Sequence, residues 1–278
     1  MHDIFYFTDI HGNLKLYNKI VQWCIKQDSE CTIIYGGDAC DRGDFGYEIM
    51  RQLLKTSRFI YLKGNHEDIF VHAANFILRD YKGELEQKSI ECYLHNCYIE
   101  NFYSNEVKLS IVNGGIKTLT DWMLDGMSKD FVNQINNLYL TFSYNNIDFC
   151  HAGGSYKTFV RVANDEYFNN TIDLEDQEEM LWDRNTFNLG WKNERICVHG
   201  HTPTICLPSR FYNNNMSKKN IHPIKYCGKD SKEYNGYKID MDTGVAIYGR
   251  AYVLNVLTGH VYGFDEIQSS PFENFKIL

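Results

Sequence analysis

Apolar residues in the first quarter of the chain alternate between two spacings. Short apolar runs of strand length lie at 3–8, 31–36 and 58–63, and each leads into a polar segment that contains glycine. Between them, residues 14–27 and 46–55 place apolar side chains at helical intervals. Strands and helices that alternate over short connections predict parallel strands joined by right-handed crossovers. This stretch therefore indicates an α/β fold.

The middle of the chain is less periodic. Residues 68–103 are mostly helical in pattern and rich in Tyr, His and charge, so we expect a helical insertion that covers one side of the sheet. Residues 129–138 predict another helix. Two short apolar runs, 139–144 and 147–150, flank an Asn-Asn pair and predict a hairpin.

The last third combines strands with one unusual segment. Residues 209–232 carry six Lys or Arg against one Asp without apolar periodicity, and we expect a long, basic, polar loop or lid there. No internal repeat or linker interrupts the pattern, so we expect a single domain over 1–278 with α/β and α+β character. The remaining strands are expected at 195–199, 238–242, 246–257 and 260–264.

Composition narrows the class of protein. A chain of 278 residues can bury a full core, and no apolar run is long enough to cross a bilayer. The N-terminus enters a strand pattern directly, without a signal peptide. The nine cysteines are odd in number and lack CxxC spacing, which favours reduced thiols in a cytoplasmic protein. The net charge of −8 argues against nucleic-acid binding by bulk electrostatics.

Polar motifs follow the first three predicted strands at the point where each ends. Asp9 and His11 follow the first, Asp38 the second and Asn65 the third. The carboxyl ends of neighbouring parallel strands share one edge, where open α/β sheets bind ligands. Asp9 and His11 are two residues apart, so on an extended segment both side chains would point the same way. We therefore expect these motifs to converge.

Two later histidines, His151 and His201, also follow predicted strands. Together with the residues above they make a mixed set of carboxylate, amide and imidazole groups, which suits manganese, iron or zinc better than calcium. Their number fits two divalent ions that share one carboxylate. One ion would take Asp9, His11 and Asp38, and the other Asp38, Asn65, His151 and His201.

The segment after the second predicted strand adds groups for a phosphate. Arg42 can fork around a phosphoryl group, and Arg184 is a second candidate. Two ions roughly 3.5–4 Å apart polarise a phosphoryl oxygen and generate a bridging hydroxide for in-line attack. His66 is expected to protonate the departing oxygen while Asp41 holds its other nitrogen. Asn65, besides its metal role, is expected to contact the phosphate.

Five ordered blocks resemble the signatures of calcineurin-like metallophosphoesterases: Asp9–Gly12, Gly37–Gly43, Gly64–Glu67, His151–Gly153 and Gly200–Pro203. More narrowly they resemble PPP-type phosphatases, in particular bacterial and bacteriophage serine/threonine phosphatases and symmetrical diadenosine tetraphosphatases. The resemblance implies a central β-sandwich flanked by helices and a dimetal centre, usually manganese. It also implies the same six ligands, the arginine pair and the His66–Asp41 acid pair.

Two departures from that pattern bear on the branch. Thr8 stands where the family usually has glycine, while the ligand after it is kept. Pro203 stands where broader phosphodiesterase relatives carry a further metal-binding histidine, which favours the PPP branch.

Several residues near the motifs have plainer interpretations. His199 is expected to be a buried histidine whose ring nitrogens are hydrogen-bonded, and Glu67 an acid in the first turn of a helix. Asp242 is expected either to orient a metal ligand through a hydrogen bond or to cap a turn. Arg184 could instead pair with the acidic residues of 165–183, and the basic 209–232 segment could instead recognise substrate anions.

Three functions compete. The first is hydrolysis of phosphoserine and phosphothreonine in proteins, with phosphotyrosine as a further substrate. The second is hydrolysis of diadenosine polyphosphates or capped RNA ends, in which nucleoside polyphosphates are the substrates. The third is a catalytically silent phosphate sensor, which the complete ligand set argues against.

Overall fold

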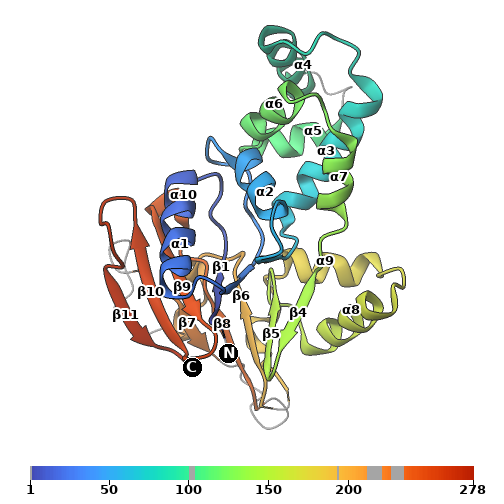
Figure 1. The fold of residues 1–278 in the computed structure, drawn as a ribbon. Coiled ribbons are helices and arrows are strands. Elements are labelled where there is room, and N and C mark those ends of the chain that lie inside the picture. The colour runs from blue at the N-terminus through green and yellow to red at the C-terminus, as the bar shows by residue number, and fades with distance from the viewer. Residues whose placement is uncertain (1, 100–103, 193, 212–220, 227–234) are drawn as a thin grey trace.

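Two mixed β-sheets form the centre of the molecule (Figure 1). The computed structural model describes residues 2–99, 104–192, 194–211, 221–226 and 235–278. The first sheet has the order β11-β10-β9-β1-β2-β3. Its strands are β1 (Ile4–Phe7), β2 (Thr32–Tyr35), β3 (Phe59–Tyr61), β9 (Arg250–Asn255), β10 (His260–Asp265) and β11 (Glu273–Lys276).

The second sheet has the order β4-β5-β6-β8-β7. Its strands are β4 (Thr141–Tyr144), β5 (Ile147–Cys150), β6 (Ile196–His199), β7 (Ile224–Tyr226) and β8 (Tyr237–Asp240). Strands β1, β2 and β3 are parallel, as are β5, β6 and β8, while β4 pairs with β5 as an antiparallel hairpin. The expected parallel crossovers and hairpin are therefore confirmed.

Alternation along the strands places one core between the sheets. Tyr6 and Ile34 face the second sheet, where the ring of Tyr6 lies 5.4 Å from that of Phe149. Phe5 and Ile33, one residue earlier on the same strands, face the helices instead. Because successive side chains point to opposite faces, each central strand contributes to two cores. The expected sandwich flanked by helices is confirmed.

Six helices gather in a lobe at one end of the sheets (Figure 1). They are α2 (Gly46–Leu54), α3 (Asn65–Asp80), α4 (Gln87–Ile99), α5 (Asn105–Val112), α6 (Ile116–Leu124) and α7 (Lys129–Asn136). Helix α3 packs against α5 and α7, and α4 against α5 and α6. Helices α8 (Tyr156–Phe168) and α9 (Leu174–Trp182) lie beside the second sheet. Residues 100–103, the end of the predicted insertion, lie outside the described residues.

Helix α1 (Leu14–Gln27) covers the first sheet with one face and leaves the other to solvent. The Asn13 side chain caps it by accepting from the backbone N–H of Leu16. Leu16, Ile20 and Cys24 are fully buried, as their spacing of four predicts. The predicted bounds of 14–27 are confirmed.

Two predictions near the C-terminal end were wrong in part. Residues 246–249 are not strand, because α10 (Val245–Tyr248) forms a helical turn between two glycines in left-handed conformation before β9 begins. The 209–232 segment is not all loop. Ser209–Phe211 is a 3-10 turn, and β7 pairs with β8 and buries Ile224 and Tyr226. Most other residues of the 209–232 segment lie outside the described ranges.

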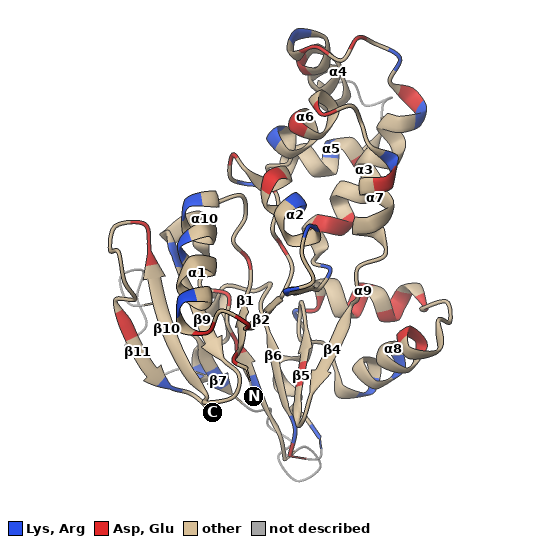
Figure 2. Cartoon of the chain, viewed as in Figure 1, with Lys and Arg blue, Asp and Glu red and all other residues tan. Residues whose placement is uncertain are grey.

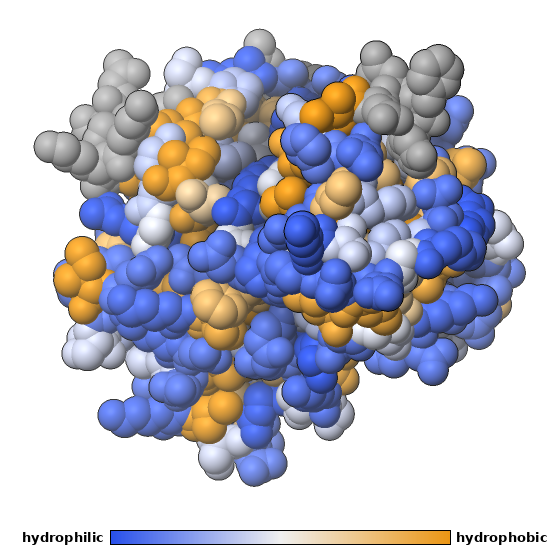
Figure 3. Space-filling model, turned by 90° about the horizontal axis from the view of Figure 1, so that it is seen from above, coloured by the Kyte–Doolittle hydropathy of each residue, from blue (hydrophilic) through white to orange (hydrophobic). Residues whose placement is uncertain are grey.

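The face of the molecule on the side of the helical lobe is mostly hydrophilic (Figure 3). Seen from the helical lobe, apolar residues form several separate groups divided by polar ones (Figure 3). No helix in the described ranges is both long enough and apolar enough to cross a membrane. No disulfide joins any two cysteines of those ranges.

Candidate functional site

The loops after β1, β2, β3, β5 and β6 meet at one edge of the sandwich and bring the six expected ligands together. The first two loops are joined by backbone bonds, in which Asp9 N donates to Gly37 O (3.1 Å) and His11 N donates to Asp38 O (3.0 Å). All six side chains are almost fully buried, with exposures of 1% for Asp9, 4% for His11, 2% for Asp38, 3% for Asn65, 0% for His151 and 5% for His201. Buried ionisable groups at this density need charge partners.

The backbone of these loops is strained. The φ angles of Asp9 (56°), His11 (46°) and Asp38 (58°) are positive, and so are those of Asp41 (65°) and His201 (70°). Each such residue costs of the order of 1–3 kcal/mol, and strain of this kind concentrates at functional sites. The expectation that Asp9 and His11 sit on an extended segment was therefore wrong. A left-handed turn docks against the next loop and brings His11 to Asp38, while the Asp9 carboxylate faces the backbone of His201.

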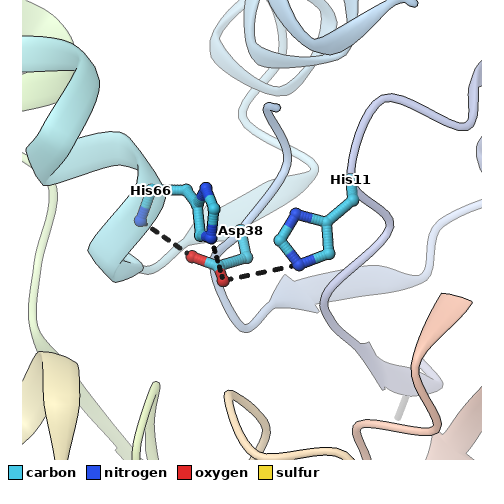
Figure 4. A group of neighbouring side chains, drawn as sticks. All are labelled: His11, Asp38 and His66. Carbon is cyan, nitrogen blue, oxygen red and sulfur yellow. Dashed lines mark hydrogen bonds and ion pairs between the residues drawn. The ribbon is translucent and has the colours of Figure 1, made fainter. Parts of the chain in front are cut away.

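Asp38 is the centre of the cluster (Figure 4). Its Oδ2 lies 3.6 Å from His11 Nε2 and 3.8 Å from His66 Nε2, while its Oδ1 lies 3.3 Å from His151 Nε2. Two sets of side chains could each hold a metal ion, and both include Asp38: His11, Asp38 and His66, and Asp38, His151 and His201. A shared carboxylate between two cation sites is the arrangement that a bridging ligand requires.

Two expected ligands, Asn65 and Asp9, are not members of those two sets. Asn65 Oδ1 lies 3.0 Å from His151 Nε2 and 2.9 Å from His201 Nδ1, so the amide oxygen faces the second set. Asp9 accepts from the Thr8 hydroxyl (2.6 Å) and from the backbone N–H of His201 (3.2 Å). Thr8 therefore supports the ligand that follows it.

His66, Asp41 and Arg42 form a second constellation beside Asp38. His66 Nδ1 lies 2.8 Å from Asp41 Oδ2, and the Arg42 guanidinium reaches Nε2 of both His11 (2.9 Å) and His66 (2.8 Å). Burial lowers the pKa of His66, but Asp38 and Asp41 outweigh it and raise that pKa above its ordinary value. The two carboxylates therefore favour the protonated form of His66.

His151 differs in charge from His11 and His201. Burial lowers the pKa of His11 to about 3 and that of His201 to about 2, so both are neutral and can donate a lone pair to a metal. His151 is opposed by burial, yet Asp38 raises its pKa to about 10. A divalent cation beside Asp38 would displace that proton, because both compete for the same lone pair.

A family model named calcineurin-like phosphoesterase matches residues 2–260. The chain belongs to this family. A protein named as a candidate diadenosine tetraphosphatase has a similar fold, with a TM-score of 0.54, 12% identity, and coverage of 95% of this chain and 93% of that one. The cold-active protein-tyrosine phosphatase of the psychrophile Shewanella sp. is also similar, with a TM-score of 0.50, 14% identity, and coverage of 99% and 81%. No curated protein sequence matches.

The residues of this phosphoesterase fit the dimetal centre of its family. His201 Nδ1 and His151 Nε2 lie 2.9 and 3.0 Å from the Asn65 amide oxygen, so two imidazole nitrogens and one oxygen converge where an ion of the second set would bind. His11 Nδ1 lies 3.0 Å from Cys40 O and His151 Nδ1 lies 2.8 Å from Gly36 O. These bonds direct the other nitrogen of each ring toward Asp38, as metal-binding histidines require.

Glu67 has a larger role in the phosphoesterase than the sequence indicated. It starts α3 as expected, since its carboxylate accepts from the backbone N–H of Gly64 (2.8 Å). The same carboxylate also accepts from the N–H groups of Asp38 (2.8 Å) and Ala39 (2.7 Å) and from the Tyr61 hydroxyl (2.8 Å). Four donors on one buried acid fix the loop that carries Asp38.

Arg184 lies on the other side of the site. It is exposed and lines a pocket of about 380 Å³ with Phe187, Thr202 and Pro203, next to His201. The ion pair with the acidic 165–183 segment is not formed among the described residues. Thr186, two residues after Arg184, is held by buried Lys238, whose Nζ donates to Thr186 O (3.2 Å) and to Gly154 O (2.6 Å). Nothing in the sequence pointed to Lys238.

Two neighbouring residues have structural partners. His199 Nε2 lies 2.9 Å from the Tyr226 hydroxyl and its Nδ1 lies 3.0 Å from Gly200 O, so it is the satisfied buried histidine that was expected. Asp242 Oδ1 accepts from Gly244 N (2.7 Å), which makes it a turn cap.

Proposed function

We propose that this phosphoesterase is a dimetal-dependent phosphomonoesterase whose main substrates are phosphoserine and phosphothreonine residues of proteins. The observation that carries the reaction class is the 2.8 Å contact of His66 with Asp41 beside a carboxylate common to both cation sets. An acid next to a dicationic site can protonate an alkoxide as it leaves phosphorus.

The metal assignment keeps the ligands expected from the sequence, so it takes Asp9 in place of the His66 of the first set and adds Asn65 to the second. Asp9, His11 and Asp38 would hold one ion, and Asp38, Asn65, His151 and His201 the other. Manganese suits this mixture of oxygen and nitrogen ligands, with iron or zinc as alternatives. When bound, the ions polarise a phosphoryl oxygen and lower the pKa of water.

The remaining groups act on the substrate directly. The Arg42 fork binds phosphoryl oxygens as charge builds on them, and Arg184 supplies a second guanidinium from the opposite side. The amide of Asn65 contacts the phosphate from the second set. His66 gives its proton to the departing oxygen while Asp41 keeps the ring oriented through Nδ1.

The phosphomonoester assignment rests on Pro203. It lines the pocket beside His201 in the place of the additional histidine of phosphodiesterase relatives. A site with this ligand set suits a terminal phosphoryl group on a serine or threonine side chain.

Hydrolysis of p-nitrophenyl phosphate with added manganese tests the reaction class. We expect turnover by the wild type and a loss of kcat of about 10²-fold or more in His66→Asn. The matched control is His72→Asn, an exposed histidine on the same helix. Absence of wild-type turnover, or equal rates for wild type and His66→Asn, would overturn the mechanism.

Comparison of two substrates tests specificity. A phosphoserine peptide should be hydrolysed with a higher kcat/KM than diadenosine tetraphosphate. Cleavage of the dinucleotide alone would replace the protein-phosphatase proposal with the nucleotide one.

A further inference from the structure

A groove runs along the solvent face of α1. Its outer part is a hollow of about 620 Å³ between α1 and the segment that follows β10. Lys15, Lys19 and Lys26 line it together with polar side chains that include Gln22 and Ser269, and its lining holds no acidic residue. In a chain with a net charge of −8, this is a local excess of positive charge, seen as the blue bands on α1 (Figure 2).

The groove continues to the active site. A second hollow of about 430 Å³ is lined by His11, Arg42 and Lys15, and also by the acidic Asp44 and Glu266. Lys15 lines both hollows, so they are neighbours, and together they are here called the α1 groove.

The lysines of the α1 groove are held differently. Lys19 donates to the backbone oxygens of Asp265 and Gln268, which ties the far wall of the groove to the helix and leaves its charge uncompensated. Lys15 lies 3.8 Å from Glu266, a loose contact at the joint of the two hollows. Lys26 has no ion pair within the described ranges. Lys19 and Lys26 therefore present positive charge that no described carboxylate pairs with, whereas the charge of Lys15 is partly offset by Glu266.

Dimensions favour an extended peptide. Lys15 and Lys26 are eleven residues apart on α1, which at 1.5 Å per residue is about 16 Å. An extended peptide advances about 3.3 Å per residue, so about five residues span this length. Gln22 and Ser269 offer hydrogen bonds to peptide groups as well as to carboxylates.

The aromatic residue of the outer groove is largely taken up by packing. Trp23 is partly buried, with its ring 4.6 Å from that of Tyr262, 5.3 Å from that of Phe264 and 5.6 Å from that of Phe5, so it packs against the sheet core. Recognition of single nucleotides relies on open aromatic faces for stacking. Lysines spaced along a polar channel suit carboxylates better.

We propose that the α1 groove binds an acidic segment that flanks the phosphorylated residue of a phosphoprotein substrate. This proposal rests on the proposed function and specifies its substrate class. Rim charges of this kind act mainly through encounter rate and salt dependence.

The test compares phosphoserine peptides of one length that carry five Glu on the N-terminal side, five Glu on the C-terminal side, or Gln throughout. The variant is Lys15→Gln/Lys26→Gln, and the control is Lys82→Gln/Lys88→Gln, two exposed lysines far along the chain in the helical lobe. We expect one acidic peptide to be preferred by the wild type. Its kcat/KM should fall about 3- to 20-fold in the groove variant alone.

Two readouts separate the possible failures. Hydrolysis of p-nitrophenyl phosphate and of the Gln peptide should stay unchanged in the groove variant, and added salt should erase the acidic preference. Turnover of all three peptides without preference, or equal losses in both double variants, would overturn the groove proposal and leave the proposed function standing. Turnover of diadenosine tetraphosphate but of no peptide would overturn both the groove proposal and the proposed function. If the groove variant then lost turnover of the dinucleotide while the control variant kept it, the groove would be assigned to nucleotides.

Discussion

Replacement of Glu67 by Gln tests whether one buried carboxylate holds the loop of the shared ligand. Glu67 is fully buried, and each of its oxygens accepts two hydrogen bonds: Oε2 from Asp38 N and Gly64 N, and Oε1 from Ala39 N and the Tyr61 hydroxyl. An amide keeps one acceptor and turns the other into a donor. With the NH₂ group turned toward Ala39 N and the Tyr61 hydroxyl, the hydroxyl can rotate to accept, but the Ala39 N–H loses its acceptor.

The magnitude follows from that one donor. A buried donor without an acceptor costs about 1–3 kcal/mol, so Glu67→Gln should lower the free energy of unfolding by about this amount. The loss is a measurable part of the roughly 5–15 kcal/mol that holds a typical protein folded. The loosened loop should also weaken metal binding, because it carries Asp38.

Urea unfolding at equilibrium measures this loss. Glu84→Gln, an exposed glutamate in the same helical lobe, is the control and should change stability by less than about 0.5 kcal/mol. A Glu67→Gln protein as stable as that control would refute the reasoning that this carboxylate organises the site.

Two further substitutions test the acid and the second arginine. Asp41→Asn removes a charge that raises the pKa of His66, so the alkaline limb of kcat for phenyl phosphate should move to lower pH. The control, Asp44→Asn, changes an exposed carboxylate and should leave the pH profile unmoved. An unmoved profile in Asp41→Asn would contradict the role of Asp41. Lys238→Met removes the bond to Thr186 O that holds the segment of Arg184 in place, so KM for p-nitrophenyl phosphate should rise about tenfold with a smaller change in kcat. An unchanged KM would contradict this role of Lys238.

Sequence patterns predicted the elements that depend on local spacing. Helix α1 was predicted to the residue because Leu16, Ile20 and Cys24 define one face; the Asn13 cap was found only in the structure. Convergence of the strand-end motifs could also be predicted, since parallel strands bring their carboxyl ends to one edge.

Features that depend on distant partners could not be predicted. Strand β7 has only three residues, so its pairing with β8 leaves no periodic signal. The left-handed turn at Asp9 exists because its backbone docks on Gly37. Glu67 and Lys238 show the same limit, because their partners come from other loops and only the folded chain brings them together.

The central claim is that two metal ions share Asp38, and metal content measures it most directly. Elemental analysis of protein loaded with manganese and then freed of excess metal should find two ions per wild-type chain. Asp9→Asn should retain about one, and Asp38→Asn should retain less, since Asp38 would contact both ions. Fewer than one ion in the wild type, or equal metal content in the two variants, would contradict the account.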